Sequence, residues 1–427
     1  MLLAELTKNM KKSSGSHRVR RVIYLSYTGM LEPLGRSQVL TYLRQLSNEY
    51  VFTLISFEKP ADLACDDAVA DLRAECFRYG IDWRPQVYHH RPRLLATSWD
   101  LIVLIWQTFR YSLGRDVCLV HSRSYVPAIA AWLCGKVTLK PFIFDMRALW
   151  PDEIVASGRL TLNSWTYRCL KWVERQLLYR AARVVSLTQA GVVYLLETYP
   201  GLVQQKFEVI TTCVDIDRFD VPERHAGRAL LKDRIPFVVG TTGSLFSGWF
   251  YLDAFLAFFQ AVKKLRPDAR VSIITRDDHK QVLEAVQKAD ISLDDVTVSC
   301  ASSTEMPAKL AEMDVGVMFF SPKIGSSPTR LGEFLAAGVP VVGNTGIGDV
   351  STLIESYQVG IVVDDVHDSC TLKKAAYDLL KRYDQIRASG ACRHAAEDYF
   401  SAADGARKYR GLYRDLILEA SELGRAR

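Results

Sequence analysis

The feature that most constrains the fold of this chain is an alternation of short apolar runs with amphipathic helical segments. In the first half, the apolar runs Val22–Gly29, Val51–Phe57 and Cys118–Ser124 are each followed by a segment with helical periodicity. Short, uniformly apolar runs are typical of parallel strands that are buried on both faces. A second series of the same kind runs from Phe237 to Val363. We therefore predict an α/β protein with two Rossmann-like domains, each a doubly wound parallel sheet.

Charged and turn-forming residues interrupt this alternation between Lys206 and Pro236, and we place the domain junction there. The 427 residues are enough for two domains of ordinary size. Two doubly wound domains imply a central cleft between them in which ligands bind. The predicted parts are a basic tail (1–21), a first Rossmann-like domain (22–211), a linker (212–235), a second Rossmann-like domain (236–395) and a terminal helical segment (396–427).

The overall charge and the cysteines narrow the function classes. A formal net charge of +6 is too small to indicate nucleic-acid binding, and it suits a phosphate-bearing small molecule or an anionic membrane surface equally well. The nine cysteines show no metal-ligand spacing and are interpreted as reduced, buried thiols in a cytoplasmic protein. The paired aspartates at 277–278, 294–295 and 364–365 lack a third regularly spaced oxygen ligand, so we expect turns there and no metal site.

Two segments leave alternatives open with respect to membranes. The basic tail has charges where a secretory signal needs an apolar core, and it forms either a solvated end or a patch for anionic lipid headgroups. The segment Leu94–Leu113 is very apolar, but Asp100 interrupts a run already near the minimum of about 18 residues for a membrane span. It is predicted to be a helix, either in the core or at a membrane interface with Trp99, Trp106 and Phe109 in the lipid.

A short helix is predicted in the stretch "SSPTRLGEFLAAGVPVVGNTG", residues 326–346. Ser327 is expected to cap its start, and Pro328 suits the first turn because the missing N–H is not needed there. Gly338 is expected to end the helix before a strand resumes. The residues expected to face the core are Leu331, Phe334 and Leu335.

The same helix carries one Arg and one Glu on another face, about one turn apart. Free N–H groups at the helix start and the guanidinium of Arg330 together form an anion site that suits a diphosphate. Glu333 lies deeper, where its carboxylate can accept hydrogen bonds from sugar or ribose hydroxyls. The alternative is an ordinary helix with a surface Arg–Glu pair that contributes at most about 0.5 kcal/mol.

At these residues the chain resembles the retaining nucleotide-sugar glycosyltransferases of family four, which have the GT-B fold. The stretch "SPTRLGEFLAAGVPVV" is similar to their donor signature, and "LSYTGMLEPLGRSQVLTYLRQLS" is similar to the N-terminal glycine loop and helix of bacterial members. The stretches "PFIFDMRALWPDE", "VVSLTQA", "FEVITTCVDIDRF" and "GTTGSL" fall in the expected order. The resemblance extends from about Arg21 to Leu416.

The resemblance implies that the first domain binds an acceptor and the second a UDP, GDP or ADP sugar. It implies glycosyl transfer with retention at the anomeric carbon and without an obligatory metal or other cofactor. The acceptor is expected to be a saccharide or a lipid-linked molecule, in polysaccharide or glycoconjugate synthesis. The protein is expected either free in the cytoplasm or bound peripherally to the cytosolic face of a membrane. The last helix is expected to cross back onto the first domain.

The resemblance also assigns residues to the donor. A basic residue of the signature meets the diphosphate and a glutamate meets the ribose, which here are Arg330 and Glu333. Arg36 and Ser37 are expected near the acceptor. The donor residues implied in this way are Gly35, Gly243, Ser244, Thr275, Ser327, Thr329, Arg330, Leu331 and Glu333.

Four polar residues follow the carboxyl ends of predicted first-domain strands and form the candidate catalytic group: His121, Arg123, Asp145 and Arg147. His121 is either a catalytic residue or a satisfied core histidine. Arg123 takes the place of a second histidine of the family, and it can polarise the donor but cannot act as a base near neutral pH. The resemblance requires no protein nucleophile, because the donor phosphate can take the acceptor proton.

The chain departs from the family pattern at two other places. Gly325 stands where relatives place a first glutamate, and "GSLFSGWFYL" has no basic residue where relatives have two. Arg330 is therefore expected to meet more of the phosphate charge, and the donor sugar has lost its usual carboxylate. These departures leave a catalytically silent binding or scaffold protein of the same fold as the alternative function, with a sugar-nucleotide epimerase ranked last.

Overall fold

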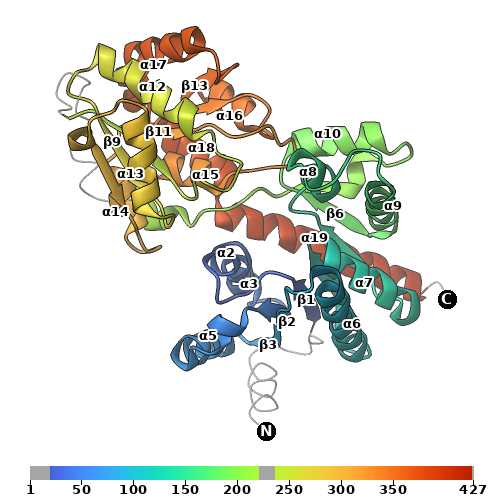
Figure 1. Ribbon diagram of the computed structural model, residues 1–427. Helices are drawn as coiled ribbons and strands as arrows, with labels where there is room; N and C mark the ends of the chain where they lie inside the picture. The colour runs from blue at the N-terminus through green and yellow to red at the C-terminus, as the bar shows by residue number, and fades with distance from the viewer. Residues whose placement is uncertain (1–19, 221–235, 426–427) are drawn as a thin grey trace. The chain divides into compact units, whose positions relative to one another are not determined.

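The computed structural model describes residues 20–220 and 236–425, which form two compact units (Figure 1). Unit 1 comprises the described residues up to Ser186, then Leu195–Ile210 and the chain from Gly405 onward. Unit 2 comprises Leu187–Tyr194 and the described residues between Thr211 and Asp404. Most of the predicted basic tail and residues 221–235 of the predicted linker lie outside the described residues.

Unit 1 is built on a seven-stranded parallel sheet with the order β3-β2-β1-β4-β5-β6-β7. The predicted strands are confirmed, but sequence reasoning missed the two edge strands, β3 and β7. β3 contains Pro85, which has no N–H to donate to a neighbouring strand. An edge strand tolerates this because one of its sides has no neighbouring strand. The bounds are β1 Arg21–Ser26, β2 Val51–Glu58, β3 Ile81–Val87, β4 Val117–Arg123, β5 Phe142–Asp145, β6 Arg183–Ser186 and β7 Phe207–Val209.

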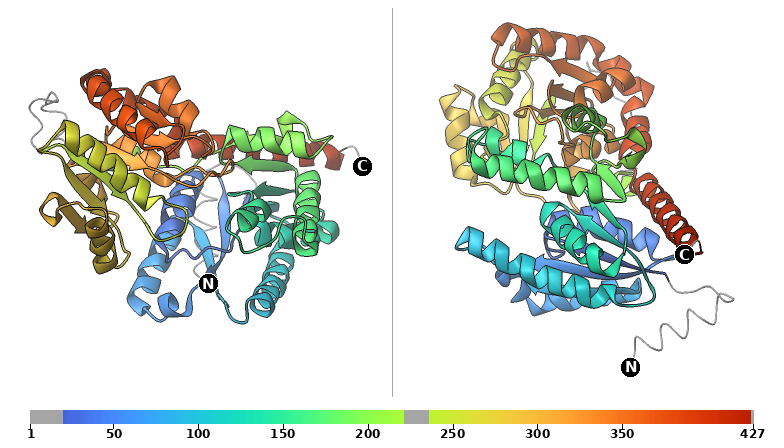
Figure 2. Two further views of the ribbon diagram at one scale, coloured as in Figure 1. Left: turned by 45° about the horizontal axis from the view of Figure 1, so that its top comes forward. Right: turned by 90° about the vertical axis from the view of Figure 1, so that its right-hand side faces the viewer.

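Helices cover both faces of this sheet (Figures 1 and 2). Right-handed crossovers require the connections that step from β1 towards β3 to use one face, and those that step from β3 towards β7 to use the other. The segment Leu94–Leu113 forms helix α6, as predicted. The bounds are α2 Pro33–Gly35, η1 Arg36–Leu40, α3 Thr41–Leu46, α4 Pro60–Leu63, α5 Asp66–Arg78, α6 Arg93–Ser112, α7 Tyr125–Thr138, α8 Trp150–Ala156, α9 Trp165–Arg180, α10 Gln189–Thr198, η2 Gln204–Lys206 and α19 Ala402–Arg425.

Unit 2 is built on a six-stranded parallel sheet with the order β10-β9-β8-β11-β12-β13. All six strands lie within the second alternating series, Phe237 to Val363, that the sequence predicts. Successive residues of β11 enter opposite cores, with Val315 and Val317 on one side and Met318 on the other. The bounds are β8 Val238–Thr242, β9 Arg270–Ile274, β10 Val296–Ser299, β11 Val315–Met318, β12 Val341–Asn344 and β13 Gly360–Val363.

The two cores of unit 2 are closed by helices with strong apolar stripes. Phe255, Phe258 and Phe259 of α12 fill one core, and Phe334 and Leu335 of α15 fill the other. The bounds are η3 Ile216–Phe219, α12 Leu252–Leu265, α13 His279–Lys288, η5 Leu293–Asp295, α14 Met306–Ala311, α15 Thr329–Ala336, α16 Val350–Tyr357, α17 Ser369–Ser389 and α18 Ala391–Phe400.

None of the nine cysteines, all of which lie in the described residues, forms a disulfide. The prediction of buried thiols is only partly correct. Four cysteines are buried, but Cys65, Cys169, Cys300 and Cys370 are exposed. Cys169 lies on α9 and Cys370 on α17, whereas Cys65 and Cys300 lie in loops.

Candidate active site

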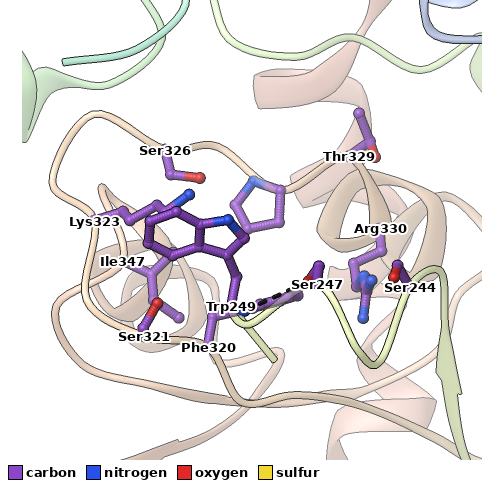
Figure 3. A pocket seen from close by; sticks show the side chains of 11 residues that line it. Ser244, Ser247, Trp249, Phe320, Ser321, Lys323, Ser326, Thr329, Arg330 and Ile347 are labelled. Carbon is purple, nitrogen blue, oxygen red and sulfur yellow. Dashed lines mark hydrogen bonds between the residues drawn. The ribbon is translucent and has the colours of Figure 1, made fainter. Parts of the chain in front are cut away.

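A pocket opens in unit 2 at the carboxyl ends of β8 and β11, which are adjacent although they are not consecutive in sequence. Ligands of doubly wound sheets bind at such a switch point, because the loops from the two strands diverge there. The pocket has a volume of about 260 Å³. Its lining residues are Ser244, Ser247, Trp249, Phe320, Ser321, Lys323, Ser326, Pro328, Thr329, Arg330 and Ile347 (Figure 3).

The lining combines positive charge, aromatic rings and hydroxyl groups. Lys323 and Arg330 are its charged residues, and none of the lining residues is acidic. Trp249 and Phe320 supply rings, and serine and threonine hydroxyls supply donors and acceptors. Figure 3 shows Trp249 and Lys323 together, with Arg330 and Ser244 at the other side of the pocket. Such a pocket suits an anionic ligand that also carries hydroxyl groups.

Arg330 is held in place by its neighbours. Its guanidinium carbon lies 4.7 Å from the centre of the Phe320 ring and 5.5 Å from that of Phe250. A Cβ atom at Gly243 would come within 2.4 Å of an Arg330 Nη atom, and Gly243 has a φ of 88°. The positive φ favours glycine at this position, and a side chain there would also have to displace the end of the Arg330 side chain.

Arg330 lacks a carboxylate within ion-pair distance in the described part of the chain. Burial lowers its pKa to about 10, although Glu333 and Asp277 act in the opposite direction. The guanidinium is still charged at neutral pH, so it is a cation without a direct anionic partner among the described residues. An anionic ligand in the pocket would compensate this charge.

Glu333 lies on α15, one turn beyond Arg330, and it does not line the pocket. Its carboxylate is half-buried and has no hydrogen bond to any described residue. Burial raises its pKa, while Arg330 and Arg218 act in the opposite direction. The carboxylate thus retains its capacity to accept hydrogen bonds from a ligand.

The start of α15 differs from the prediction that Ser327 caps it. The cap position is Pro328, without a side-chain cap, and the helix begins at Thr329. The Ser327 hydroxyl instead forms hydrogen bonds with Thr211 and Thr212, at 2.5 and 3.1 Å, which fasten the loop. The prediction was wrong because short hydroxyl side chains also bond across loops.

The end of α15 is confirmed. Gly338 adopts a φ of 68° and donates to the Leu335 carbonyl at 2.9 Å, while Val339 donates to the Phe334 carbonyl at 2.9 Å. This is a Schellman motif, in which glycine is favoured. Leu331 is buried in the core beneath the helix, with 1% of its surface exposed, and so does not reach the pocket.

Lys323 is a pocket cation that sequence reasoning missed. Its Nζ atom lies 3.1 Å from the centre of the Trp249 ring, and its backbone bonds to Gly346 and Gly348 on the next loop. The stretch after β8 has no basic residue, and the structure supplies one from the loop after β11. The sequence did contain one indication of this role. Lys323 follows the carboxyl end of a predicted strand, where ligands of such sheets bind.

Asp277 is a second residue whose role sequence reasoning missed. Its carboxylate accepts hydrogen bonds from the Leu245 and Phe246 N–H groups, at 2.6 and 3.2 Å, and from the Ser244 hydroxyl at 3.1 Å. Burial alone would raise its pKa, but these hydrogen bonds lower it. The carboxylate fixes the loop that carries Ser244 into the pocket. Asp278, its neighbour, caps the start of α13 with its side chain.

Thr275 follows β9 but is buried and does not line the pocket. Its N–H donates to the Ser299 carbonyl at 2.8 Å, and its hydroxyl accepts from the Asp277 N–H at 3.0 Å. Of the predicted donor residues, only Ser244, Thr329 and Arg330 line the pocket itself. No group of three metal-ligating side chains occurs among the described residues.

The four candidate catalytic residues of unit 1 form a buried cluster beneath α19. His121 Nδ1 lies 2.7 Å from the Tyr413 hydroxyl, and the Tyr409 hydroxyl donates to Asp145 at 2.9 Å. His121 is 1% exposed and Asp145 is 0% exposed. His121 is therefore a buried histidine with a partner, and neither side chain is open to solvent.

The buried cluster contains more positive than negative charge. Asp145 lies 3.5 Å from Arg147, 3.5 Å from His121 and 3.9 Å from Arg123. Burial alone would raise the pKa of Asp145, but Arg147 and His121 hold it well below its usual range. Burial lowers the pKa of His121, which favours the neutral ring. One carboxylate thus faces two guanidinium groups.

The predicted glycine loop of unit 1 is organised by its own side chains. A Cβ atom at Gly35 would lie 2.0 Å from the Gly29 carbonyl oxygen, so the close approach is to this backbone. The buried Glu58 accepts hydrogen bonds from the Met30 and Leu31 N–H groups, a role that sequence reasoning missed. Arg36 is exposed and pairs with Glu75, and the Ser37 hydroxyl bonds to the Leu34 carbonyl.

Comparison with known proteins agrees with this geometry. Residues 236–382 match the family model Glycosyl transferases group 1. The match lies within unit 2, and the matched part includes every residue that lines the pocket. The search of curated proteins found no match to this chain.

Solved structures with the same fold include glycosyltransferases of the GT-B class. The Anabaena protein HepE, solved with UDP, has 14% identity and a TM-score of 0.67 over 92% of this chain and 100% of its own. Sucrose-phosphate synthase from Thermosynechococcus elongatus has 14% identity and a TM-score of 0.68 over 94% and 100%. A putative UDP-N-acetylglucosamine 2-epimerase from Listeria monocytogenes has 12% identity and a TM-score of 0.61 over 94% and 97%. At these identities the comparison establishes the fold.

Proposed function

We propose that this protein is a retaining glycosyltransferase of family four, which moves a hexosyl group from a nucleoside-diphosphate sugar to a saccharide or lipid-linked acceptor. The observation that carries the proposal is the pocket at the β8–β11 switch point. It holds two cations, two aromatic rings and several hydroxyls, and its lining has no acidic residue. The pathway we propose is the synthesis of a polysaccharide or glycoconjugate, with the protein in the cytoplasm.

The two cations of the pocket stabilise the leaving group of the proposed reaction. In the reaction, the bond between the anomeric carbon and the β-phosphate oxygen breaks, and a bond to the acceptor oxygen forms. The acceptor proton passes to the departing phosphate, which leaves as the nucleoside diphosphate. Arg330 and Lys323 stabilise the negative charge that develops on this group. Because two side chains supply this charge, the proposal includes no obligatory metal or other cofactor.

The ribose and the sugar are assigned to different parts of the site. Glu333, which has no hydrogen bond to a described residue, accepts from the ribose hydroxyls. The sugar hydroxyls are met by Ser321 and Ser326, because Gly325 provides no carboxylate. UDP is the first donor nucleotide to test, because the HepE structures contain UDP and UDP-glucose.

The test is a panel of UDP, GDP and ADP sugars added to the purified protein. We expect the sugars of one nucleotide to raise the unfolding temperature of the protein. One of these sugars should release nucleoside diphosphate when an acceptor is present. Arg330→Ala should lose both responses, while Arg73→Ala on the exposed face of α5 should keep them. The proposal fails if no nucleotide sugar gives a response, or if Arg330→Ala matches the parent.

The departure at Gly325 favours one rival, a binding or scaffold protein without transferase activity. This rival predicts nucleotide-dependent stabilisation without release of nucleoside diphosphate for any acceptor. Transfer that is lost in Glu333→Ala would eliminate it. Analysis of the sugar after incubation without acceptor detects epimerisation, which would instead support an epimerase.

A further inference from the structure

Helices α6, α7 and α9 of unit 1 expose large apolar side chains on faces where water-facing helices are normally polar. They join strands that step in the same direction across the sheet, so they cover the same sheet face. Cys134 of α7 bonds to the Ile105 carbonyl of α6, and the rings of Trp132 and Trp172 bring α7 and α9 to a centre-to-centre distance of 6.5 Å. Figure 1 shows α6 and α7 side by side.

On α6, the exposed side is the apolar side. Leu95, Trp99, Ile102 and Trp106 follow one another at intervals of three and four residues, and each is more than half exposed. The one acidic residue of the helix, Asp100, is turned inward and accepts hydrogen bonds from Tyr27 and His89. The polarity of this helix is therefore inverted relative to a helix that faces water.

The neighbouring helices continue the same surface. α7 exposes Val137, and α9 exposes Trp165 and Trp172. The chain has eight tryptophans, and the four that are exposed all lie on α6 and α9. Tryptophan is enriched where proteins meet the interface between lipid tails and headgroups.

The charges between these apolar side chains have a single sign. Among the side chains of these helices that the structure describes, the exposed ionised ones are Arg110, Lys136, Arg168, Arg175 and Arg180. The acidic residues of these helices are Asp100 and Glu174, and both are fully buried. A solvent-facing helical layer without an exposed carboxylate is complementary to a negatively charged surface.

We propose that the outward face of α6, α7 and α9 binds the surface of an anionic phospholipid bilayer. The leucine, isoleucine and tryptophan side chains enter the boundary between headgroups and tails, and the arginines and the lysine contact the headgroup phosphates. No helix in the described part of the chain is both long and apolar enough to cross a bilayer. A protein partner is disfavoured because the apolar surface is spread over three helices and is interspersed with like charges.

The experiment is flotation of the full chain with vesicles of phosphatidylcholine alone and of phosphatidylcholine with about one-third phosphatidylglycerol. We expect binding to the anionic vesicles that weakens as salt is added. The double variant Trp99→Ala/Trp106→Ala should bind at least about tenfold more weakly. Lys136→Glu should bind about fivefold more weakly or worse. The matched controls on α5 are Phe77→Ala and Arg73→Glu, which should bind as the parent does.

Two results would overturn the inference. One is equal, weak association with neutral and anionic vesicles. The other is a dimer in analytical ultracentrifugation that Trp99→Ala/Trp106→Ala dissociates, because the face would then bind a second copy. The inference does not depend on the donor site. Arg330→Ala should still bind vesicles, and the tryptophan variant should still be stabilised by the nucleotide, so failure of one proposal is distinguishable from failure of the other.

Discussion

The substitution Arg330→Met distinguishes the effect of Arg330 on the stability of the protein from its effect on the binding of the nucleotide. A pKa lowered from 12.5 to about 10 corresponds to about 3.5 kcal/mol of destabilisation of the charged form, at about 1.4 kcal/mol per pH unit. The rings of Phe250 and Phe320 offset this by about 1 kcal/mol. Methionine removes the charge and packs well against aromatic rings. We therefore expect the variant without nucleotide to be about 2–3 kcal/mol more stable than the parent.

The matched control is Arg266→Met in the same unit. Arg266 also lies near an aromatic ring, with its guanidinium carbon 5.6 Å from the centre of Phe237. Unlike Arg330, it has a carboxylate partner, Asp268 at 2.9 Å, and the hydrogen bonds that Arg266 donates to this carboxylate raise the pKa of Arg266. The charged form of Arg266 is therefore favoured by the fold. We expect Arg266→Met to be less stable than the parent by about 1 kcal/mol.

Denaturant unfolding without and with UDP measures both effects. A nucleotide at one hundred times its dissociation constant should stabilise the parent by about 2.7 kcal/mol. Arg330→Met should gain little, whereas Arg266→Met should gain as much as the parent. If Arg330→Met is the less stable variant without nucleotide, burial of Arg330 carries no cost and the electrostatic reasoning fails. If it keeps the full nucleotide effect, the diphosphate does not bind at Arg330.

Three further changes test neighbouring residues. Burial raises the pKa of Glu333, so its contribution to stability is full below its ordinary pKa of 4.5 and is lost as the pH rises through the raised value. Glu333→Gln should therefore be more stable than the parent at pH 8 and equal at about pH 4, in urea titrations, with weaker nucleotide binding. Lys323→Ala should weaken UDP binding about tenfold in calorimetry, with Lys309→Ala on α14 unchanged. Gly243→Ala should destabilise the protein by at least about 1 kcal/mol in thermal unfolding, because a side chain there meets Arg330 at a positive φ.

The sheets were predictable because buried parallel strands leave a strong signal in the sequence. All six strands of unit 2 are short apolar runs, and the Schellman end of α15 follows from one glycine. The edge strands β3 and β7 were missed, since an edge strand is covered on fewer sides and tolerates polar residues and proline. In β3, four of seven residues are polar or proline.

The pocket was only half predictable. Arg330 and Thr329 lie on a helix that the local sequence predicts, although the residue expected to cap it does not do so. Lys323 and Trp249 meet through loops that follow two different strands, and local patterns do not reveal which loops adjoin. The hydrogen bond between Asp277 and Ser244 was unpredictable for the same reason, because the two residues lie in loops that follow two neighbouring strands.

The two units share a strand order but use their switch points differently. In unit 2 the loops that follow β8 and β11 diverge and enclose the pocket. In unit 1 the ends of β4 and β5 are covered by Tyr409 and Tyr413 of α19. The topology therefore indicates where a site can form, and the covering segment decides whether that position is open. The sequence could not show this because α19 lies about 260 residues from Asp145.

Asp145→Asn tests whether this covered cluster supports the fold or the reaction. The change leaves the guanidiniums of Arg123 and Arg147 buried without their carboxylate, which costs about 3–5 kcal/mol when one partner of a buried ion pair is removed. The low pKa of Asp145 means that its contribution is present at neutral pH and is lost only under strongly acidic conditions. The control is Asp116→Asn, whose half-exposed pair with Arg21 should contribute at most about 1 kcal/mol. Urea unfolding and the transfer assay are measured together. If Asp145→Asn is as stable as the parent yet has no transferase activity, the cluster acts in the reaction, and the structural interpretation of His121 and Asp145 is wrong.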